Sequence, residues 1–433
     1  MKKMTKTLIA SALTFTAAGA SAAAFQLAEV STSGLGLAYA GNAAVADNAS
    51  VVATNPALMT KFKRAEISAG GTLIDTNVDV EGKTALNVNP LFGSDASHKN
   101  IIPTAFVPNL YVVVPVNDRF ALGGGVNVNY GLKSEFGQTY NAGVFAGKTD
   151  LTALNLNLSG AYELGYGFSF GLGLNAVYAK AELERHAGDT SLLYNMTAGA
   201  ALTNNSTTVS RMKGDDWGFG WNVGLTYDIN EGNRIGVAYH SPVKLRFKGQ
   251  FSNQLPLVLG GTAGAELPGS LGLELPAYWE VSTFHKLTDK LAFQFSYKRT
   301  DWSSFQELRA TGSNGAPLLQ KDEKFSDNSR VAVGLSYDVN PALTLRTGVA
   351  FDETASVEHP SISIPDTDRT WYTVGATYRF TPNLSVDLAY AHLRGSKSSF
   401  TESQRLSNGA TYSADVKVKS SANIYGLNLN YKF

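Results

Sequence analysis

The chain has 433 residues with 36 basic and 36 acidic side chains, so its formal net charge is zero at neutral pH. This balance leaves no cationic excess to neutralise phosphates and argues against a nucleic-acid partner. The absence of cysteine excludes disulfides and thiolate metal sites, and a charged fraction of 17% is low for a water-soluble surface. We expect no cofactor.

Residues 1–22 have the pattern of a secretory signal. Lys2, Lys3 and Lys6 precede the apolar run LIASALTFTAAGA, and Ala20-Ser21-Ala22 forms an A-x-A cleavage site. The run is too short to span a bilayer as a helix; the alternative is an N-terminal anchor helix. No later segment has about 18 uninterrupted apolar residues, so no transmembrane helix is expected.

Residues 23–63 form a compact apolar segment without strand periodicity. The stretch ASVVATNPALM (49–59) is broken by Asn55-Pro56, and Pro56 cannot lie inside a sheet. Glu29 and Asp47 are its only acidic residues, and no basic residue precedes Lys61. Low charge and high apolar content suit burial; the alternative is a disordered periplasmic tail.

From about Ala65 onward the sequence alternates with a period of two. In 168–178 aromatic or aliphatic residues face one way from Phe168 to Tyr178, and small or polar residues such as Gly171 and Asn175 face the other. At ~45° tilt, ten steps rise roughly 23 Å, which is close to the apolar band of a membrane barrel. A soluble sandwich also alternates, but it does not need aromatic residues at both ends of its strands.

The turns give the number of strands. Short polar connections occur at 116–119, 163–167, 228–233, 287–290, 338–342 and 380–383, and longer loops lie near 81–103, 131–150, 184–215, 247–277, 308–328, 352–370 and 395–415. Six short periplasmic turns, with both termini on that side, predict seven hairpins. We therefore expect an all-β protein, with residues 64–433 forming a 14-stranded antiparallel transmembrane β-barrel and residues 23–63 forming a plug, or hatch, inside its lumen.

Several features bear on what such a barrel carries. Arg185 follows an apolar lumenal face, so it can orient the carboxylate of a ligand with a hydrocarbon tail; the alternative is an exposed rim arginine. Burial of about fifteen methylenes at ~0.8 kcal/mol each would contribute roughly 12 kcal/mol to binding, whereas an exposed ion pair adds about 0–1 kcal/mol. The tail would therefore supply the affinity, and the charge would orient the ligand. The apolar loops 191–203 and 255–276 form either an external groove or a packed lid.

A glycine run also lies within a predicted strand. Gly123, Gly124 and Gly125 mark either a bend that opens the wall towards lipid or close packing against the plug.

The chain resembles the FadL family of outer-membrane transporters of long-chain fatty acids. The resemblance is carried by the N-terminal stretch 24–59 with Asn55-Pro56-Ala57, by TDLTALNLNLSGAYEL, FGLGLNAVYAKAELERHAGD, DWGFGWNVGLTYDI and SISIPDTDRTWYTVG, and by the C-terminal strand. It implies that the ligand is captured in an external groove, passes to a lumenal pocket, rearranges the hatch and leaves sideways through a gap in the wall. The gap would lie at a kinked third strand, and the Asn-Pro-Ala segment would face it.

The resemblance also assigns roles to individual residues. Arg185 and Lys321 would bind the head group, Phe25 would touch the tail, Asp352 would lie near the hatch, and Ala105 and Gly131 would flank the gap. The expected partners are a long-chain fatty acid and outer-membrane lipids, and the expected state is a monomer.

Three other functions are alternatives to fatty acid transport. An outer-membrane hydrolase would need a nucleophile and base, and the six histidines show no recognisable spacing, so we expect no enzyme. A general porin would lack the plug. A channel for small aromatic hydrocarbons would share both barrel and plug, but it would not need Arg185 and Lys321.

Overall fold

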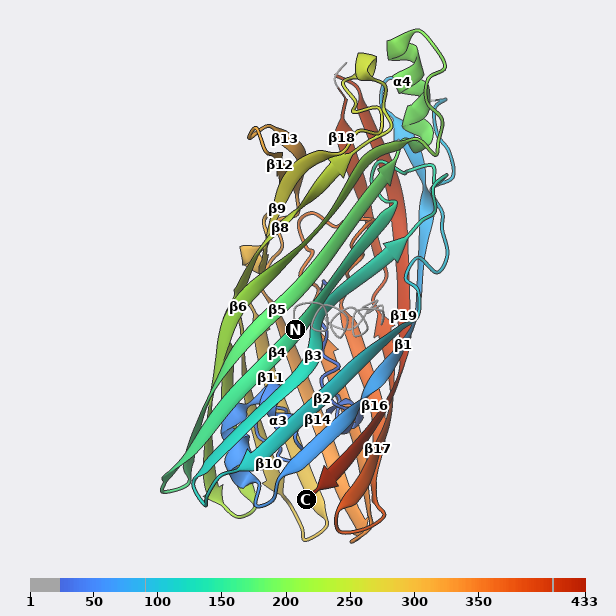
Figure 1. Ribbon diagram of the computed structural model, residues 1–433. Helices are drawn as coiled ribbons and strands as arrows, with labels where there is room; N and C mark the ends of the chain where they lie inside the picture. Colours follow the sequence, from blue (N-terminus) through green and yellow to red (C-terminus); the bar gives the residue numbers. More distant parts are fainter. Residues whose placement is uncertain (1–23, 90, 407–408) are drawn as a thin grey trace.

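The computed structural model describes residues 24–89, 91–406 and 409–433, and these form a closed antiparallel barrel (Figure 1). The sheet closes where β1 pairs with β19 along their whole length, from Glu66↔Lys432 to Leu86↔Tyr412. The β segments are β1 (Glu66–Leu86), β2 (Ala105–Pro115), β3 (Phe120–Glu135), β4 (Lys148–Gly165), β5 (Phe168–His186), β6 (Thr208–Asn230), β7 (Asn233–His240), β8 (Val243–Ser252), β9 (Leu267–Leu275), β10 (Tyr278–Lys286), β11 (Leu291–Thr300), β12 (Glu307–Gly312), β13 (Pro317–Asp322), β14 (Asn328–Asn340), β15 (Leu343–Asp352), β16 (Arg369–Arg379), β17 (Leu384–Gly395), β18 (Ser398–Arg405) and β19 (Thr411–Lys432).

In the described chain these segments make fourteen barrel strands, because five strands are each interrupted once: β7/β8, β9/β10, β11/β12, β13/β14 and β17/β18. Two of the interruptions contain prolines, Pro242 and Pro276, which have no N–H to give to the ladder. The predicted strand number and the six short turns are confirmed.

The predicted long loops were too wide, since the strands continue to pair well beyond the apolar belt. β5 and β6 stay paired up to His186↔Thr208. The predicted loop 308–328 was wrong, because most of it forms the β12–β13 hairpin. The predicted signal peptide, residues 1–22, lies outside the described residues.

The outer surface of the strands carries an apolar belt. On β5, Phe168, Phe170, Leu172 and Leu174 are exposed, whereas the intervening Ser169, Gly171 and Gly173 are buried. Aromatic pairs mark both edges of the belt, with ring centroids 4.5 Å apart for Phe168–Tyr227 and 5.1 Å apart for Tyr178–Trp217. This is the surface of a membrane-spanning barrel. Among the described residues, no helix is long and apolar enough to cross a membrane.

Residues 24–62, here called the N-terminal segment, lie inside the barrel (blue in Figure 1). Hydrogen bonds join the segment to opposite parts of the wall: Thr32 Oγ1 donates to Asn428 Oδ1 (2.6 Å) on β19, Gly41 N to Ser296 Oγ (2.9 Å) on β11, and Thr60 Oγ1 to Ser169 Oγ (2.9 Å) on β5. Its helical turns are α2 (Thr32–Gly36), α3 (Val51–Thr54) and η1 (Pro56–Lys61), and those elsewhere are η2 (Gly188–Thr190), α4 (Ser191–Ala198), η3 (Leu257–Leu259) and η4 (Trp302–Ser304).

Candidate ligand-binding site and wall opening

Arg185 and Lys321 line one cavity in the upper lumen, with a volume of about 680 Å³. Arg185 Nη1 donates to the carbonyls of Lys148 (3.0 Å) and Glu184 (2.9 Å), and Nη2 donates to Thr149 Oγ1 (3.2 Å). These neutral acceptors fix the guanidinium without neutralising it. The fold thus brings together two cations that are 136 positions apart in the sequence.

Lys321 is already paired with carboxylates, which the sequence analysis missed. Its Nζ lies 2.9 Å from Glu402 Oε1 and 3.4 Å from Glu323 Oε1, and it also donates to Ser361 Oγ. Burial alone would lower the pKa of Lys321, but Glu402 and Glu323 outweigh burial and raise it. Glu323 could have been found as the same-face neighbour two residues along, whereas no local signal points to Glu402.

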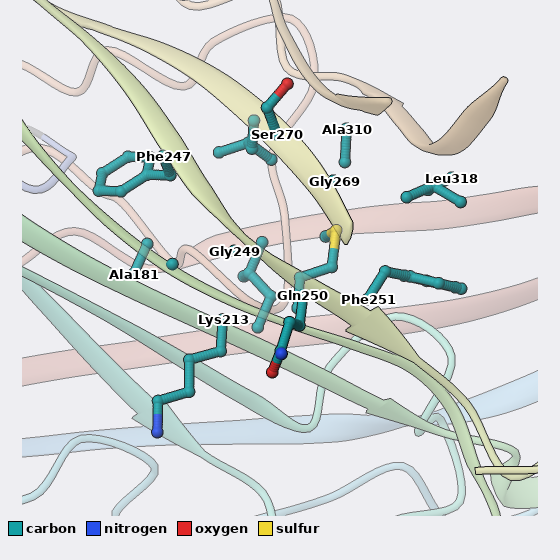
Figure 2. A pocket seen from close by; sticks show the side chains of 14 residues that line it. Ala181, Lys213, Phe247, Gly249, Gln250, Phe251, Gly269, Ser270, Ala310 and Leu318 are labelled. Atoms are coloured by element: carbon teal, nitrogen blue, oxygen red, sulfur yellow. The ribbon is translucent and has the colours of Figure 1, made fainter. Parts of the chain in front are cut away.

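An apolar surface lies beside these charges. Leu183 and Leu308 line the cavity and also pack within a hydrophobic cluster. The cluster includes Phe247 and Phe251 of β8, which line a crevice together with Leu318 (Figure 2). The predicted apolar upper lumen is therefore present, with the charged groups at one end.

Phe25 belongs to the same hydrophobic cluster. Its ring centroid is 4.7 Å from that of Trp302, 5.6 Å from that of Phe305 and 6.2 Å from that of Tyr130. Trp302 points inward because η4 interrupts the strand between β11 and β12, and its side chain is fully buried. The N-terminal segment thus ends the apolar surface that starts near Arg185 and Lys321.

The wall is discontinuous between β2 and β3. Their pairing ends at Asn109↔Asn127, although β2 begins at Ala105 and β3 runs on to Glu135. A register shift between Val128 and Tyr130 marks a bulge at Asn129. Ala105 and Gly131 both lie in these stretches, which do not pair with each other.

The N-terminal segment pairs with the bulged part of β3. Leu27 N donates to Asn129 O (2.9 Å), and Gly131 N donates to Phe25 O (2.9 Å). Gln26 and Tyr130 form the corresponding antiparallel bridge. The segment therefore supplies partners for backbone groups that β2 leaves unpaired.

Of the two alternatives for Gly123, Gly124 and Gly125, the structure shows close packing at Gly123 and no bend. All three glycines pair in unbroken register with β2, so the irregularity lies four residues beyond them, at Asn129. A Cβ at Gly123 would lie 2.5 Å from Met59 Sδ and 2.9 Å from Val52 Cγ2. Close approach of the N-terminal segment explains this glycine.

Asn55-Pro56-Ala57 lies against another part of the wall than the resemblance implied. Side chains at Gly171 of β5 and Gly224 of β6 would collide with this segment. Asn55 Oδ1 accepts a hydrogen bond from Ala57 N (3.1 Å), and its Nδ2 donates to Ala43 O (2.8 Å). Asn-Pro-Ala thus contacts β5 and β6, whereas Phe25 and Leu27 contact the irregular part of β3.

Asp352 lies in a row of charges that crosses five strands. Register pairs Glu280↔Lys298, Lys298↔Arg330, Arg330↔Asp352 and Asp352↔Arg369 link β10, β11, β14, β15 and β16. The row contacts the N-terminal segment, because Lys298 Nζ donates to Gln26 Oε1 (3.0 Å) and the Arg330 guanidinium lies 5.9 Å from the Tyr39 ring. Asp352 is thus linked to the segment through Arg330.

A polar cavity of about 50 Å³ lies between the N-terminal segment and β3–β6. Asparagine side chains form a hydrogen-bonded chain along it: Asn157 Nδ2 donates to Asn175 Oδ1 (2.8 Å), and Asn175 Nδ2 donates to Asn222 Oδ1 (2.9 Å). Asn129 lines the same cavity, so the lumen beside the bulge is polar.

Apolar side chains are exposed outside the barrel, on the two loops singled out in the sequence. Leu192 and Met196 of α4 and Leu257 and Val258 of η3 are exposed, and α4 contacts η3. A patch of this kind is typical of a binding surface.

Comparisons with known proteins agree with this architecture. A family model described as outer membrane protein transport protein (OMPP1/FadL/TodX) matches residues 13–433. The chain is 56% identical to a 47 kDa outer membrane protein of Pasteurella multocida (100% of this chain, 99% of the relative) and 43% identical to a long-chain fatty acid transport protein of Escherichia coli O6:H1 (99% and 98%).

Two solved structures share the fold. A FadL homologue of Pseudomonas aeruginosa aligns with a TM-score of 0.83 at 24% identity, covering 95% of this chain and 100% of that one. The Ralstonia pickettii toluene transporter TbuX aligns with a TM-score of 0.64 at 19% identity, covering 92% and 98%.

Proposed function

Since the chain belongs to the OMPP1/FadL/TodX family of outer membrane transport proteins, we propose that it is a passive transporter for long-chain fatty acids and not an enzyme. It is an integral β-barrel of the outer membrane. Its relatives at 40% identity and above include proteins named as long-chain fatty acid transporters.

One observation carries this proposal: two cations and a long apolar surface meet in one cavity. A carboxylate between Arg185 and Lys321 would form charge-assisted hydrogen bonds, and the attached chain would follow the hydrophobic cluster towards Phe25. The exposed apolar patch on α4 and η3 would hold the ligand before it enters.

Exit would use the β2–β3 discontinuity. A tail that displaced Phe25 from Trp302 would also weaken the bond from Gly131 N to Phe25 O, because one residue makes both contacts. The ligand could then leave sideways between the stretches that hold Ala105 and Gly131. In this scheme the contacts of Asn55-Pro56-Ala57 with β5 and β6 hold that end of the N-terminal segment in place. Arg330, paired in register with Asp352, contacts the segment at Tyr39 and would limit its movement there.

Binding of oleate and of toluene to the wild type, Arg185→Ala and Lys321→Ala tests the proposal. Loss of a charged hydrogen-bonding partner should weaken oleate binding by about ten- to a hundredfold, since such bonds contribute about 1.5–3 kcal/mol. Toluene has no head group and should bind all three proteins alike. Unchanged oleate binding, or tight toluene binding alone, would favour an aromatic-hydrocarbon channel, and open conductance of the full-length protein in planar bilayers would indicate a general porin.

A further inference from the structure

The site around Lys321 contains as many carboxylates as cations. Arg185 and Lys321 carry the positive charges, and Glu323 and Glu402 carry the negative ones. The Glu323 side chain is 0% exposed and that of Glu402 is 10% exposed. The charges of these four groups therefore cancel.

The two glutamates differ in their partners. Glu402 accepts a hydrogen bond from Ile362 N (2.8 Å) and pairs with Lys321 (2.9 Å), so both of its oxygens are used. In the described part of the chain, neither oxygen of Glu323 accepts a hydrogen bond of normal geometry, and the nearest cation is Lys321 Nζ at 3.4 Å. Of the two glutamates, Glu323 is therefore the less stabilised as a carboxylate.

An incoming carboxylate would upset this balance. It would compete for Lys321 and leave the buried site with one surplus negative charge, which is costly away from water. When like charges share a buried site, one of them is readily protonated. Burial already raises the pKa of Glu323, and Glu402 raises it further, while Lys321 and Arg185 lower it.

We propose that Glu323 takes up one proton from solvent when a fatty acid carboxylate binds between Arg185 and Lys321, so that loading of the site is linked to pH. The inference rests on the proposed function, because it requires an anionic head group in this cavity. The other charged and titratable groups lining the cavity are Asp322 of β13, Glu358 and His359 of the β15–β16 loop, and Arg405 of β18.

The test is calorimetric titration of the full-length protein in lipid nanodiscs with dodecanesulfonate, an alkyl anion that cannot take up the proton itself. Protons taken up per ligand are obtained from runs in buffers of different ionisation enthalpy. For the wild type we expect roughly one proton per ligand and an affinity that falls as the pH rises, by up to about tenfold per pH unit. Glu323→Gln should take up none and should bind with little pH dependence.

Asp322→Asn is the matched control, since Asp322 lines the same cavity but is exposed; it should behave as the wild type. Dodecanoate in parallel separates the two hypotheses. Tight dodecanoate binding without proton uptake, or uptake that persists in Glu323→Gln, would overturn the role of Glu323 and leave fatty acid transport standing. Failure of the wild type to bind either ligand at any pH would overturn both.

Discussion

The N–H of Gly131 on β3 donates a hydrogen bond to the carbonyl of Phe25 across 2.9 Å, where β2 and β3 have ceased to pair. The N-terminal segment thus replaces a neighbouring strand along this short stretch. An edge closed by a short segment can open at far lower cost than one closed by a continuous ladder, because few hydrogen bonds must break.

Replacing Phe25 by alanine should loosen this contact. A buried Phe→Ala change costs about 3–5 kcal/mol in a packed core, and here it removes the contacts with Trp302, Phe305 and Tyr130. Hydrogen exchange should show faster exchange at the amides of Leu27 and Gly131. Phe25→Leu retains most of the buried volume and should exchange nearly as the wild type does; equal protection in Phe25→Ala would mean that the aromatic cluster does not hold the segment.

Adding a side chain at Gly123 should displace the base of the N-terminal segment. Valine there would overlap Met59 and Val52, and overpacking of this kind costs about 1–3 kcal/mol. We expect higher ion conductance of Gly123→Val in planar bilayers. Gly160→Ala is the control, because a Cβ at Gly160 meets no atom closer than 3.7 Å; equal conductance of both variants would contradict the packing role.

The two partners of the ion pair between Arg346 and Asp47 should contribute unequally to the stability of the N-terminal segment. Arg346 Nη2 lies 3.1 Å from Asp47 Oδ2; the Arg346 side chain is 4% exposed and that of Asp47 is 34% exposed. Asp47→Asn removes a partly solvated charge and should cost about 1 kcal/mol or less. Arg346→Met should cost about 3 kcal/mol, because it also deprives the buried Asp387 of the positive charge near it.

Resistance to thermal unfolding and to limited proteolysis within residues 42–55 should be highest in the wild type, slightly lower in Asp47→Asn and lowest in Arg346→Met. Equal destabilisation by the two substitutions would argue that the pair acts alone and that Asp387 does not depend on Arg346.

The exposed patch on α4 and η3 should affect the rate of capture and not the lumenal affinity. Leu257 and Val258 are exposed, and replacing them by serine removes apolar surface that a ligand tail could cover. Covering such surface contributes ~25 cal/mol per Å² to the free energy of binding. Uptake at low fatty acid concentration should fall, while binding to the Arg185–Lys321 cavity stays the same. A loss of equilibrium affinity instead would place the principal site outside the barrel.

The period-two pattern alone determined much of this protein. It placed Phe168 and Tyr178 on the lipid side and Gly171 and Asn175 in the lumen, and the turns gave fourteen strands, because side chains in a strand alternate whatever the strand pairs with. The low charge of the N-terminal segment indicated burial. Each of these inferences depends only on neighbours along the chain.

Barrel closure decided the rest, because it brings together residues that no local pattern connects. The family resemblance pointed to Lys321, but nothing along the chain indicates that Glu402 lies 2.9 Å from it. The glycines at 123–125 left open a bend or close packing against the plug, and the bulge instead lies at Asn129, where Phe25 and Leu27 offer the backbone hydrogen bonds that β2 does not. Which strand faces which part of the N-terminal segment follows from register and closure, and these are properties of the assembled sheet.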